Sequence, residues 1–486
     1  MRSVAEGVGR SRPTEVRGDW LDRLSPHLVG LALMGVAVAA YWFVGSPRFY
    51  NHFVWQAMAF LHGEVAIDWP VEGAYGSGYG NGWMQDVYPL LDATGQQTGK
   101  ALLPFPPLPA LVLLPFVAIW GFATDIRAVS VLLGAVNVGL CWWAMRRLPV
   151  SSRIALATAV LFGFGTVAWY AAQLGTTWFF AHVVALTFVL LAVGVALGAD
   201  RRAAEPAGPS PMPGTVLRDV RSALVRPLQL IDRRQFLAGL LFGLACTARL
   251  PIVFAAPFLV LVGGGDSWLR RAVSAGLGAA IPVGALLLFN LAVTGSLVHP
   301  GYDYQYQLEA NGYPGLHYNP EWSVEDVRYV PQNIAIMLAR LPVLFPDHIP
   351  NAVVTGAPLC VDPGAERGLF DPSCPLALPD DVGMSILLTT PAYLLMLPAL
   401  LRPRSRLAIG AIVALAAVAF FDLMHFSQGW VQFGYRFSND FAVFALVLVA
   451  LAMAQRGRVG WLGAGLIGVS IAINLWGVLW TRILGW

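Results

Sequence analysis

Charged side chains are scarce in this 486-residue chain, at 12% of its residues, against about 25% in an ordinary soluble domain. No soluble basic domain or recognition motif is present, so nucleic acid is not an expected partner. The sequence also has no Asp-X-Asp pair, P-loop or His-Glu-X-X-His motif. These absences favour a lipid-borne donor over a soluble nucleotide in any transfer reaction. No internal repeat is visible, which disfavours an inverted-repeat transporter.

The sequence is instead rich in long apolar runs. Hydrophobic residues make up 57% of the chain, and the mean hydropathy is +0.62. A helix needs about 20 apolar residues to cross a bilayer. The sequence thus predicts an all-α polytopic membrane protein with about 11–13 transmembrane helices and two large extracytoplasmic loops. The expected spans are 28–44, 104–122, 128–145, 154–172, 178–198, 236–264, 272–293, 383–401, 407–425, 441–454 and 461–480.

Arginine placement predicts the orientation. The leader 1–27 carries five arginines and the linker 199–235 carries seven, so both should be cytoplasmic. Five passes between them would put the linker outside. Either one of the early apolar segments does not cross the membrane, or the linker is an exception to the positive-inside rule. We favour a cytoplasmic linker. The 236–264 run, interrupted at Pro251, could itself be two short passes.

The predicted organisation has three parts: the leader 1–27, a transmembrane module 28–454, and a C-terminal transmembrane helix within 455–486. The module contains outer loop 1 (47–103), the basic linker 199–235 and outer loop 2 (298–382). Outer loop 2 holds Cys360 and Cys374, which would form a disulfide in an oxidising compartment. Two free thiols are the alternative.

Outer loop 1 offers three acids for base catalysis: Asp92, Asp86 and Asp68. Transfer to a hydroxyl needs a carboxylate within hydrogen-bond reach of the acceptor oxygen. Lys100, where the chain returns to the membrane, could hold an anionic leaving group. The alternative is that each of these four residues is an ordinary solvated charge in a loop.

A second group of candidates lies between and within later spans. Arg436, beside Tyr435, could clamp a phosphate and be held by Asp440 one helical turn on, or it could anchor at the interface. Arg249 lies between apolar stretches, where an unpaired charge is costly; it should face a cavity or a partner, or mark a boundary between two short helices. His182 lies at the start of a span, where its side chain either contacts a ligand or packs against neighbouring residues.

Tyrosines are dense at 299–318, and they include Tyr302 and Tyr304. Aromatic faces with polar edges suit sugars, although an interfacial aromatic belt has the same composition.

Several stretches carry a family resemblance: NHFVWQAMAFLHGE, GKALLPFPPLPALVLLPFVAIWG, GLACTARLPIVFAAPFLVLV, FNLAVTGSLVHPGY, MSILLTTPAYLL and QFGYRFSNDFAVFALVLVAL. Their order resembles the GT-C superfamily of polyprenyl-phosphate-sugar glycosyltransferases, near the protein O-mannosyltransferase and aminoarabinose transferase branches. The resemblance covers most of 51–454.

The resemblance implies a catalytic acid in the first outer loop. The position directly after the first span reads Phe49 to His52 and has no acid. The nearest match is Asp92, upstream of the Gly99–Lys100 step, so the resemblance assigns the base role first to Asp92, then to Asp86 and Asp68. It also implies a donor-phosphate contact at Arg436 and a divalent metal, Mg or Mn, without naming its ligands.

The resulting hypothesis is an inverting membrane glycosyltransferase. It would take a sugar from a polyprenyl-phosphate carrier to a hydroxyl of an extracytoplasmic glycan, lipid or protein. The expected location is the bacterial cytoplasmic membrane, among its lipids, with the site facing outward. A non-catalytic transporter or flippase of a lipid-linked sugar is the alternative from another class, and a membrane scaffold is a third.

Overall fold

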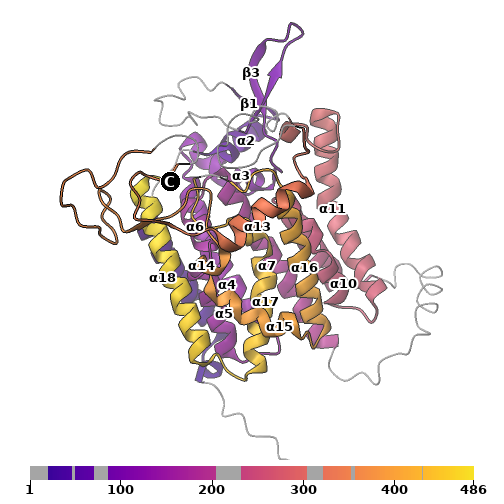
Figure 1. The fold of residues 1–486 in the computed structure, drawn as a ribbon. Coiled ribbons are helices and arrows are strands. Elements are labelled where there is room, and N and C mark those ends of the chain that lie inside the picture. Colours follow the sequence, from indigo (N-terminus) through magenta and orange to yellow (C-terminus); the bar gives the residue numbers. More distant parts are fainter. Residues whose placement is uncertain are drawn as a thin grey trace, which may run out of the picture.

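The computed structural model describes residues 20–45, 50–69, 86–203, 231–303, 321–351, 356–429 and 431–486. Tyr304 lies outside these ranges. The described residues form a long helical bundle with a small antiparallel sheet projecting from one end (Figure 1). A short 3₁₀ turn, η1 (Trp20–Arg23), precedes the first long helix.

Among the described residues, seven helices are long and apolar enough to cross a membrane. An eighth span is possible if α5 (Ser152–Phe164) and α6 (Ala168–Leu174), bent by 49° at their junction, act together. The predicted class of helical polytopic membrane protein is confirmed. The seven helices are α1 (Pro26–Val44), α4 (Ile126–Met145), α7 (Thr177–Ala203), α11 (Trp268–Thr294), α16 (Arg406–Met424), α17 (Ser438–Gln455) and α18 (Gly460–Leu484).

Prolines break two of the expected runs, so the expected 11–13 spans are not all continuous helices. Proline lacks an N–H and cannot continue a helix normally. The 236–264 run divides after α9 (Arg233–Cys246), and the chain continues through η4 (Leu250–Ala255) and α10 (Pro257–Leu261). The 383–401 run likewise becomes α14 (Ile386–Thr389), η7 (Pro391–Met396) and α15 (Leu397–Leu401). The division near Pro251 is as predicted.

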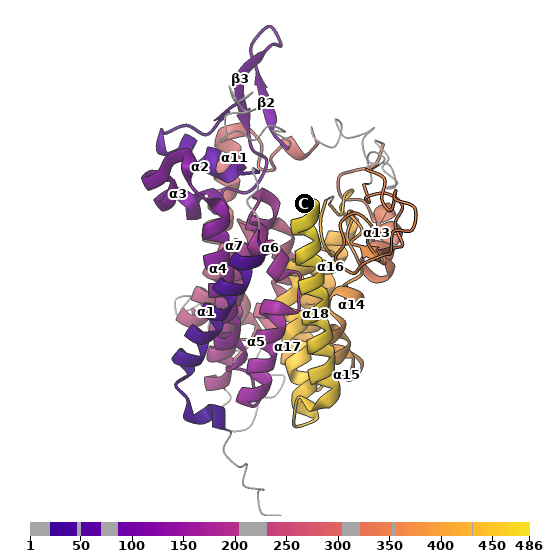
Figure 2. The same ribbon diagram turned by 90° about the vertical axis from the view of Figure 1, so that its left-hand side faces the viewer.

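The expected span at 104–122 does not cross the bundle. Its helix α3 (Leu108–Trp120) has 13 residues, about 20 Å of helix against about 30 Å of hydrocarbon. A short turn, η2 (Gly121–Ala123), follows it. In both ribbon views α3 lies beside α2 (His52–Leu61) at the end of the bundle that carries the sheet (Figures 1 and 2). We call this end the hairpin end.

The short α3 resolves the orientation conflict. Among the described residues before the basic linker, α1, α4, the bent α5–α6 pair and α7 run between the two ends, so Trp20 and Ala203 share the end opposite the hairpin (Figure 2). We call it the linker end, since α7 finishes there at Ala203 and α9 begins there at Arg233. A hydrogen bond from Ser152 Oγ to Asp22 Oδ1, 2.5 Å, ties α5 to the leader turn there.

The first outer segment folds onto the hairpin end. Strands β1 (Ile67–Asp68), β2 (Tyr88–Leu91) and β3 (Gln97–Leu102) form a sheet of order β1-β3-β2, with Tyr88 opposite Leu102. Most residues of α2 are buried, because α3 and the sheet cover it.

The second outer segment lies at the same end. It contains η6 (Val327–Tyr329), α13 (Val330–Ala339) and a two-stranded sheet of β4 (Val343–Leu344) and β5 (Ala377–Leu378). A disulfide joins Cys360 to Cys374. Asn333 Nδ2 of α13 donates to the carbonyls of Leu423, 2.9 Å, and His425, 2.8 Å. These bonds fix the segment to the end of α16.

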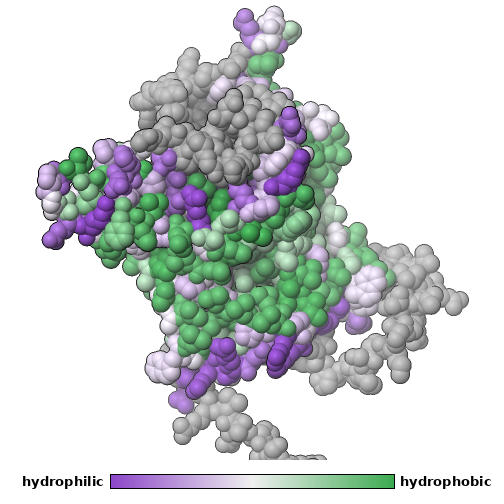
Figure 3. All heavy atoms as spheres, in the orientation of Figure 1, coloured by the Kyte–Doolittle hydropathy of each residue, from purple (hydrophilic) through white to green (hydrophobic). Residues whose placement is uncertain are grey.

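Helices α7 and α17 form the centre of the bundle. In each, 83% of the spanning window is buried, against 11% in α1. The space-filling view shows an apolar belt around the bundle, with hydrophilic residues toward its two ends (Figure 3). The hairpin ends of α7 and α17 therefore meet in the protein interior, where polar side chains must find protein partners.

Candidate functional site

Asp440 holds together three elements that are distant in sequence. It stands in the first turn of α17, and its side chain is only 1% exposed. Its carboxylate accepts hydrogen bonds from Arg249 Nη2 at 2.6 Å and Nε at 3.2 Å, and it lies 2.9 Å from His182 Nδ1 in α7. A buried carboxylate with a two-pronged guanidinium contact has fixed geometry. Arg249 is thus held at the hairpin end.

Arg249 stands where α9 gives way to η4. The backbone turns there, so the residue is a boundary between two short helices, and it also has the expected partner. Its side chain is 20% exposed, while those of Asp440 and His182 are almost fully buried. One edge of the guanidinium is therefore bonded to Asp440, and part of the side chain remains accessible.

Phe437 brings the second arginine to the same place. The guanidinium carbons of Arg249 and Arg436 each lie 5.1 Å from the centroid of the Phe437 ring. Arg436 also lies over Phe179, at 5.6 Å. Such cation–π contacts stabilise a guanidinium in a partly desolvated position. Two cations thus share one aromatic platform.

Gly429 makes room for Arg436. It has φ +99°, and a Cβ there would lie 2.6 Å from the Arg436 guanidinium carbon. Only glycine meets both conditions without strain. We expected Asp440 to hold Arg436; instead Asp440 bonds Arg249 and His182, and Arg436 lies between aromatic rings.

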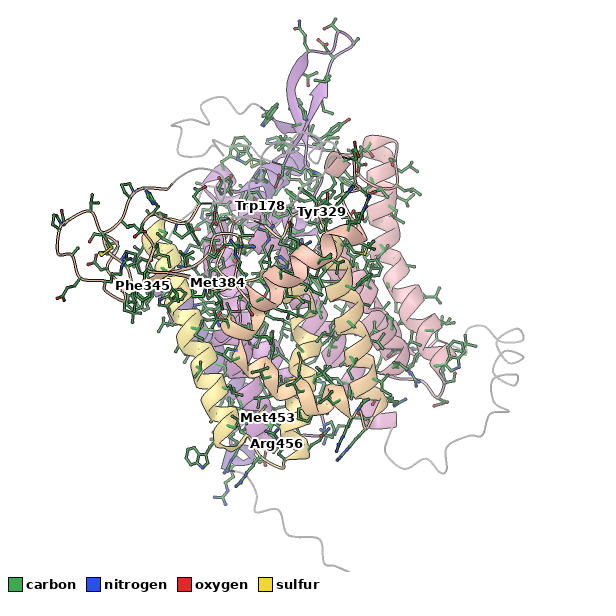
Figure 4. The ribbon with its side chains drawn as sticks, viewed as in Figure 1. Trp178, Tyr329, Phe345, Met384, Met453 and Arg456 are labelled. Atoms are coloured by element: carbon green, nitrogen blue, oxygen red, sulfur yellow. A yellow bond between two sulfur atoms is a disulfide. The ribbon has the colours of Figure 1, made fainter. Side chains whose placement is uncertain are left out.

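Asp86 faces this cationic group from the first outer segment. Trp178 Nε1 donates to its Oδ2 at 2.6 Å, and Trp178 lies at the hairpin end of the bundle (Figure 4). Asp86 has φ +60°, an uncommon conformation that Asp tolerates better than most residues. Burial raises the pKa of Asp86, while the Trp178 hydrogen bond and the charges of Arg436 and His425 oppose that rise. A carboxylate with a raised pKa is a better proton acceptor.

Tyr302 and His425 complete the group. Burial raises the pKa of Tyr302, and the charges of Arg249, Asp86 and Glu325 all act on it, so the phenol lies within electrostatic reach of both the acid and a cation. Its ring packs against Phe105 with centroids 6.3 Å apart. His425 Nδ1 lies 3.2 Å from Glu325 Oε1.

The structure places three other candidates apart from this group. Asp92 lies in the exposed turn between β2 and β3, where its Oδ1 accepts from the hydroxyl of Thr94 at 2.6 Å and from its amide at 2.8 Å. These bonds hold the pKa of Asp92 below its usual value, so it is a weak base. Lys100 Nζ pairs on the sheet with Glu64 at 2.7 Å and with Asp68 at 2.8 Å.

Sequence reasoning missed Trp178, Phe437, His425 and Asp422. Asp422 left a readable signal, because it is an acid inside an apolar span, where an ionisable group marks a functional site by default. It is buried at the end of α16, and its charge interacts with those of Asp440 and Arg249. Its Oδ2 has no hydrogen-bond partner among the described residues. The aromatic residues had no such signal, since the chain has many.

Tyr435 is fully buried beside this cluster. Its ring centroid is 6.0 Å from that of Phe437, and its hydroxyl has no hydrogen-bond partner within the described ranges. In the part of the chain that the structure describes, no three His, Cys, Asp or Glu side chains converge in a metal-binding arrangement. The residues present therefore name no metal ligands, and the steps proposed below use none.

No protein-family model matches this sequence, and no curated protein matches it. The structure is similar to the crystal structure of the oligosaccharyltransferase of Archaeoglobus fulgidus in its apo form, with a TM-score of 0.45 and 14% sequence identity. The alignment covers 96% of this chain and 56% of that one, so the chain spans little more than half the length of the archaeal enzyme.

Proposed function

We propose that this chain is a GT-C-like membrane glycosyltransferase that moves a sugar from a polyprenyl-phosphate carrier to an acceptor hydroxyl, with inversion. The observation that carries the proposal is that Asp86 interacts with Arg436, which shares the Phe437 ring with Arg249, at one end of a membrane bundle. A proton-accepting carboxylate and two cations are what such a transfer requires: one to activate the hydroxyl and the others to stabilise the departing phosphate.

Asp86 takes the base role in this proposal. Among the three candidate acids of the first outer segment, it is the one on which the charge of Arg436 acts, and burial raises its pKa. It removes the proton of the acceptor hydroxyl, whose oxygen attacks the anomeric carbon. The bond from that carbon to the phosphate oxygen breaks, and the polyprenyl phosphate leaves with the electron pair.

Arg249 and Arg436 hold the donor phosphate. Both guanidinium groups lie on the Phe437 platform, and the planar fork of a guanidinium suits phosphate. Asp440 and His182 position Arg249 from the interior side. The phosphate charge increases on departure, so two fixed cations stabilise the transition state more than the ground state.

Tyr302 provides aromatic surface beside these groups and is a proposed sugar contact, whereas Tyr435 is buried and packs against the Phe437 ring. The acceptor enters from the hairpin end, where the two outer segments lie. Exposed arginines such as Arg402, Arg404, Arg456 and Arg458 mark the linker end, and Arg456 is labelled there in Figure 4. The positive-inside rule then makes the linker end cytoplasmic and the site extracytoplasmic in a bacterial inner membrane.

A transfer assay tests this function. Purified protein in lipid nanodiscs is given radiolabelled polyprenyl-phosphate sugars and a membrane extract as acceptor, with and without divalent metal. We expect release of free polyprenyl phosphate and label in a new product. Movement of intact lipid-linked sugar across a sealed vesicle membrane, with no cleavage for any donor, would instead establish the transporter alternative.

A further inference from the structure

A cavity lies at the opposite end of the bundle from the site. It has a volume of about 850 Å³ and is bordered by the turn between α4 and α5, the end of α7 and the start of α16. Its apolar wall includes Leu197 and Leu451. The proposed transfer chemistry uses none of these residues.

The charges that line this cavity are mainly positive. Among its described lining residues, four arginines face two aspartates, Asp22 and Asp200. Both acids already have partners, since Asp22 accepts from Ser152 and Asp200 pairs with Arg406. The four arginines are Arg146, Arg147, Arg201 and Arg406.

Two of the arginines are held by aromatic contacts at the wall. The Arg147 guanidinium carbon lies 3.6 Å from the Trp143 ring centroid, and its Nη1 donates to the Trp143 carbonyl at 3.0 Å. Arg146 lies over Trp142 at 5.3 Å. Guanidinium groups ordered in this way lose less entropy when they bind an anion.

Two helix N-termini add to the positive potential. Ser151 caps α5 by accepting from the Ile154 amide, and Ser405 caps α16 by accepting from the Ala408 amide. Both serines line the cavity. The first turn of a helix carries a partial positive charge that favours anions.

We propose that this cavity binds a phosphate-bearing anion at the membrane surface, separately from the transfer site. The arginines and helix N-termini take the phosphate, and the apolar wall suits an adjoining acyl chain. Basic pockets between transmembrane helices bind anionic lipid headgroups by this combination. The same phosphate chemistry would also take a soluble phosphate compound.

Native mass spectrometry of the full-length protein in detergent tests the proposal. Palmitoyl-oleoyl phosphatidylglycerol or phosphatidylcholine is titrated, and the bound lipids are counted for the native protein and for a double variant, Arg146→Gln with Arg201→Gln. The matched control is Arg458→Gln, which removes an exposed arginine at the same end outside the cavity lining. Size-exclusion profiles show that each variant is folded.

We expect preferential binding of phosphatidylglycerol, weakened about fivefold per removed cavity arginine, since a juxtamembrane charge contributes about 1 kcal/mol. The control should bind like the native protein. If millimolar inorganic phosphate displaces the lipid from the native protein, the site recognises the phosphate group itself; if it does not, the acyl chain is also required. Equal phosphatidylglycerol binding by native protein and double variant would overturn the proposal.

Should the double variant fail to fold, Ala454→Trp supplies a second test, because it fills the cavity from α17 and changes no charge. We expect it to reduce phosphatidylglycerol binding and leave phosphatidylcholine binding unchanged. Unchanged binding of both lipids would also contradict the proposal.

Discussion

Neutralising one member of the Arg249–Asp440 pair should lower the free energy of unfolding much more than replacing both members with neutral residues. Asp440→Asn keeps the shape of the side chain and removes its charge. Arg249 then loses the counter-charge 2.6 Å away, and His182 loses its charged partner. Removal of one member of a buried pair costs about 3–5 kcal/mol. Because the Arg249 side chain is 20% exposed, we expect the lower part of that range, about 3 kcal/mol.

The double variant Asp440→Asn with Arg249→Met removes both charges. Neutral replacements of a buried pair are often nearly neutral in stability, so we expect recovery to within about 1 kcal/mol of the native protein. The assay is unfolding in mixed micelles, followed by intrinsic fluorescence. Arg328→Gln, whose side chain is 54% exposed in its ion pair with Asp326, is the control and should change stability little. A double variant that loses at least as much stability as Asp440→Asn alone would refute the reasoning, because the cost would then lie in lost contacts.

Three further predictions concern the outer segments. Transfer activity should fall as the pH falls through the pKa of Asp86, which burial raises above its ordinary value. Trp178→Phe should move this acid limb of the pH–rate profile to higher pH, because it removes a hydrogen bond that favours the charged form of Asp86. Profiles of both proteins measure the shift, and an acid limb at the same pH in both would contradict the prediction. Asp92→Asn should leave the rate within about twofold, because Asp92 only holds an exposed turn; a large loss in the same transfer assay would restore it as the base. Replacing Cys360 and Cys374 with serine should lower unfolding free energy by about 3 kcal/mol, the loop-closure value for some 15 residues, whereas an unchanged melting temperature would show that the disulfide does not stabilise the fold.

The class of fold could be predicted from the sequence because length and hydropathy determine whether a helix can cross a bilayer. The number of continuous spans could not, since α3 and the segment around Pro391 are apolar enough to cross but too short or too broken. Apolar composition reports that a segment avoids water; it does not distinguish a crossing helix from one packed at the end of a bundle.

The site was partly predictable. Arg249 was readable as a charge in apolar surroundings, where an unpaired charge is too costly to persist, but which acid pairs with it depends on packing. Asp86 and Asp92 are six positions apart and could not be ranked by sequence. Their difference arises because Trp178, distant in the chain, covers one, while the hairpin carries the other into solvent.

The measurement that tests the account most directly is the transfer rate of Asp86→Asn beside that of Asp92→Asn. Both variants receive the same labelled polyprenyl-phosphate sugar at saturation, and donor binding is measured separately so that loss of the base is distinguished from loss of the lipid. We predict a loss of about 10²–10⁴-fold for Asp86→Asn with donor binding retained. An Asp86→Asn variant that transfers sugar at the native rate would contradict the account.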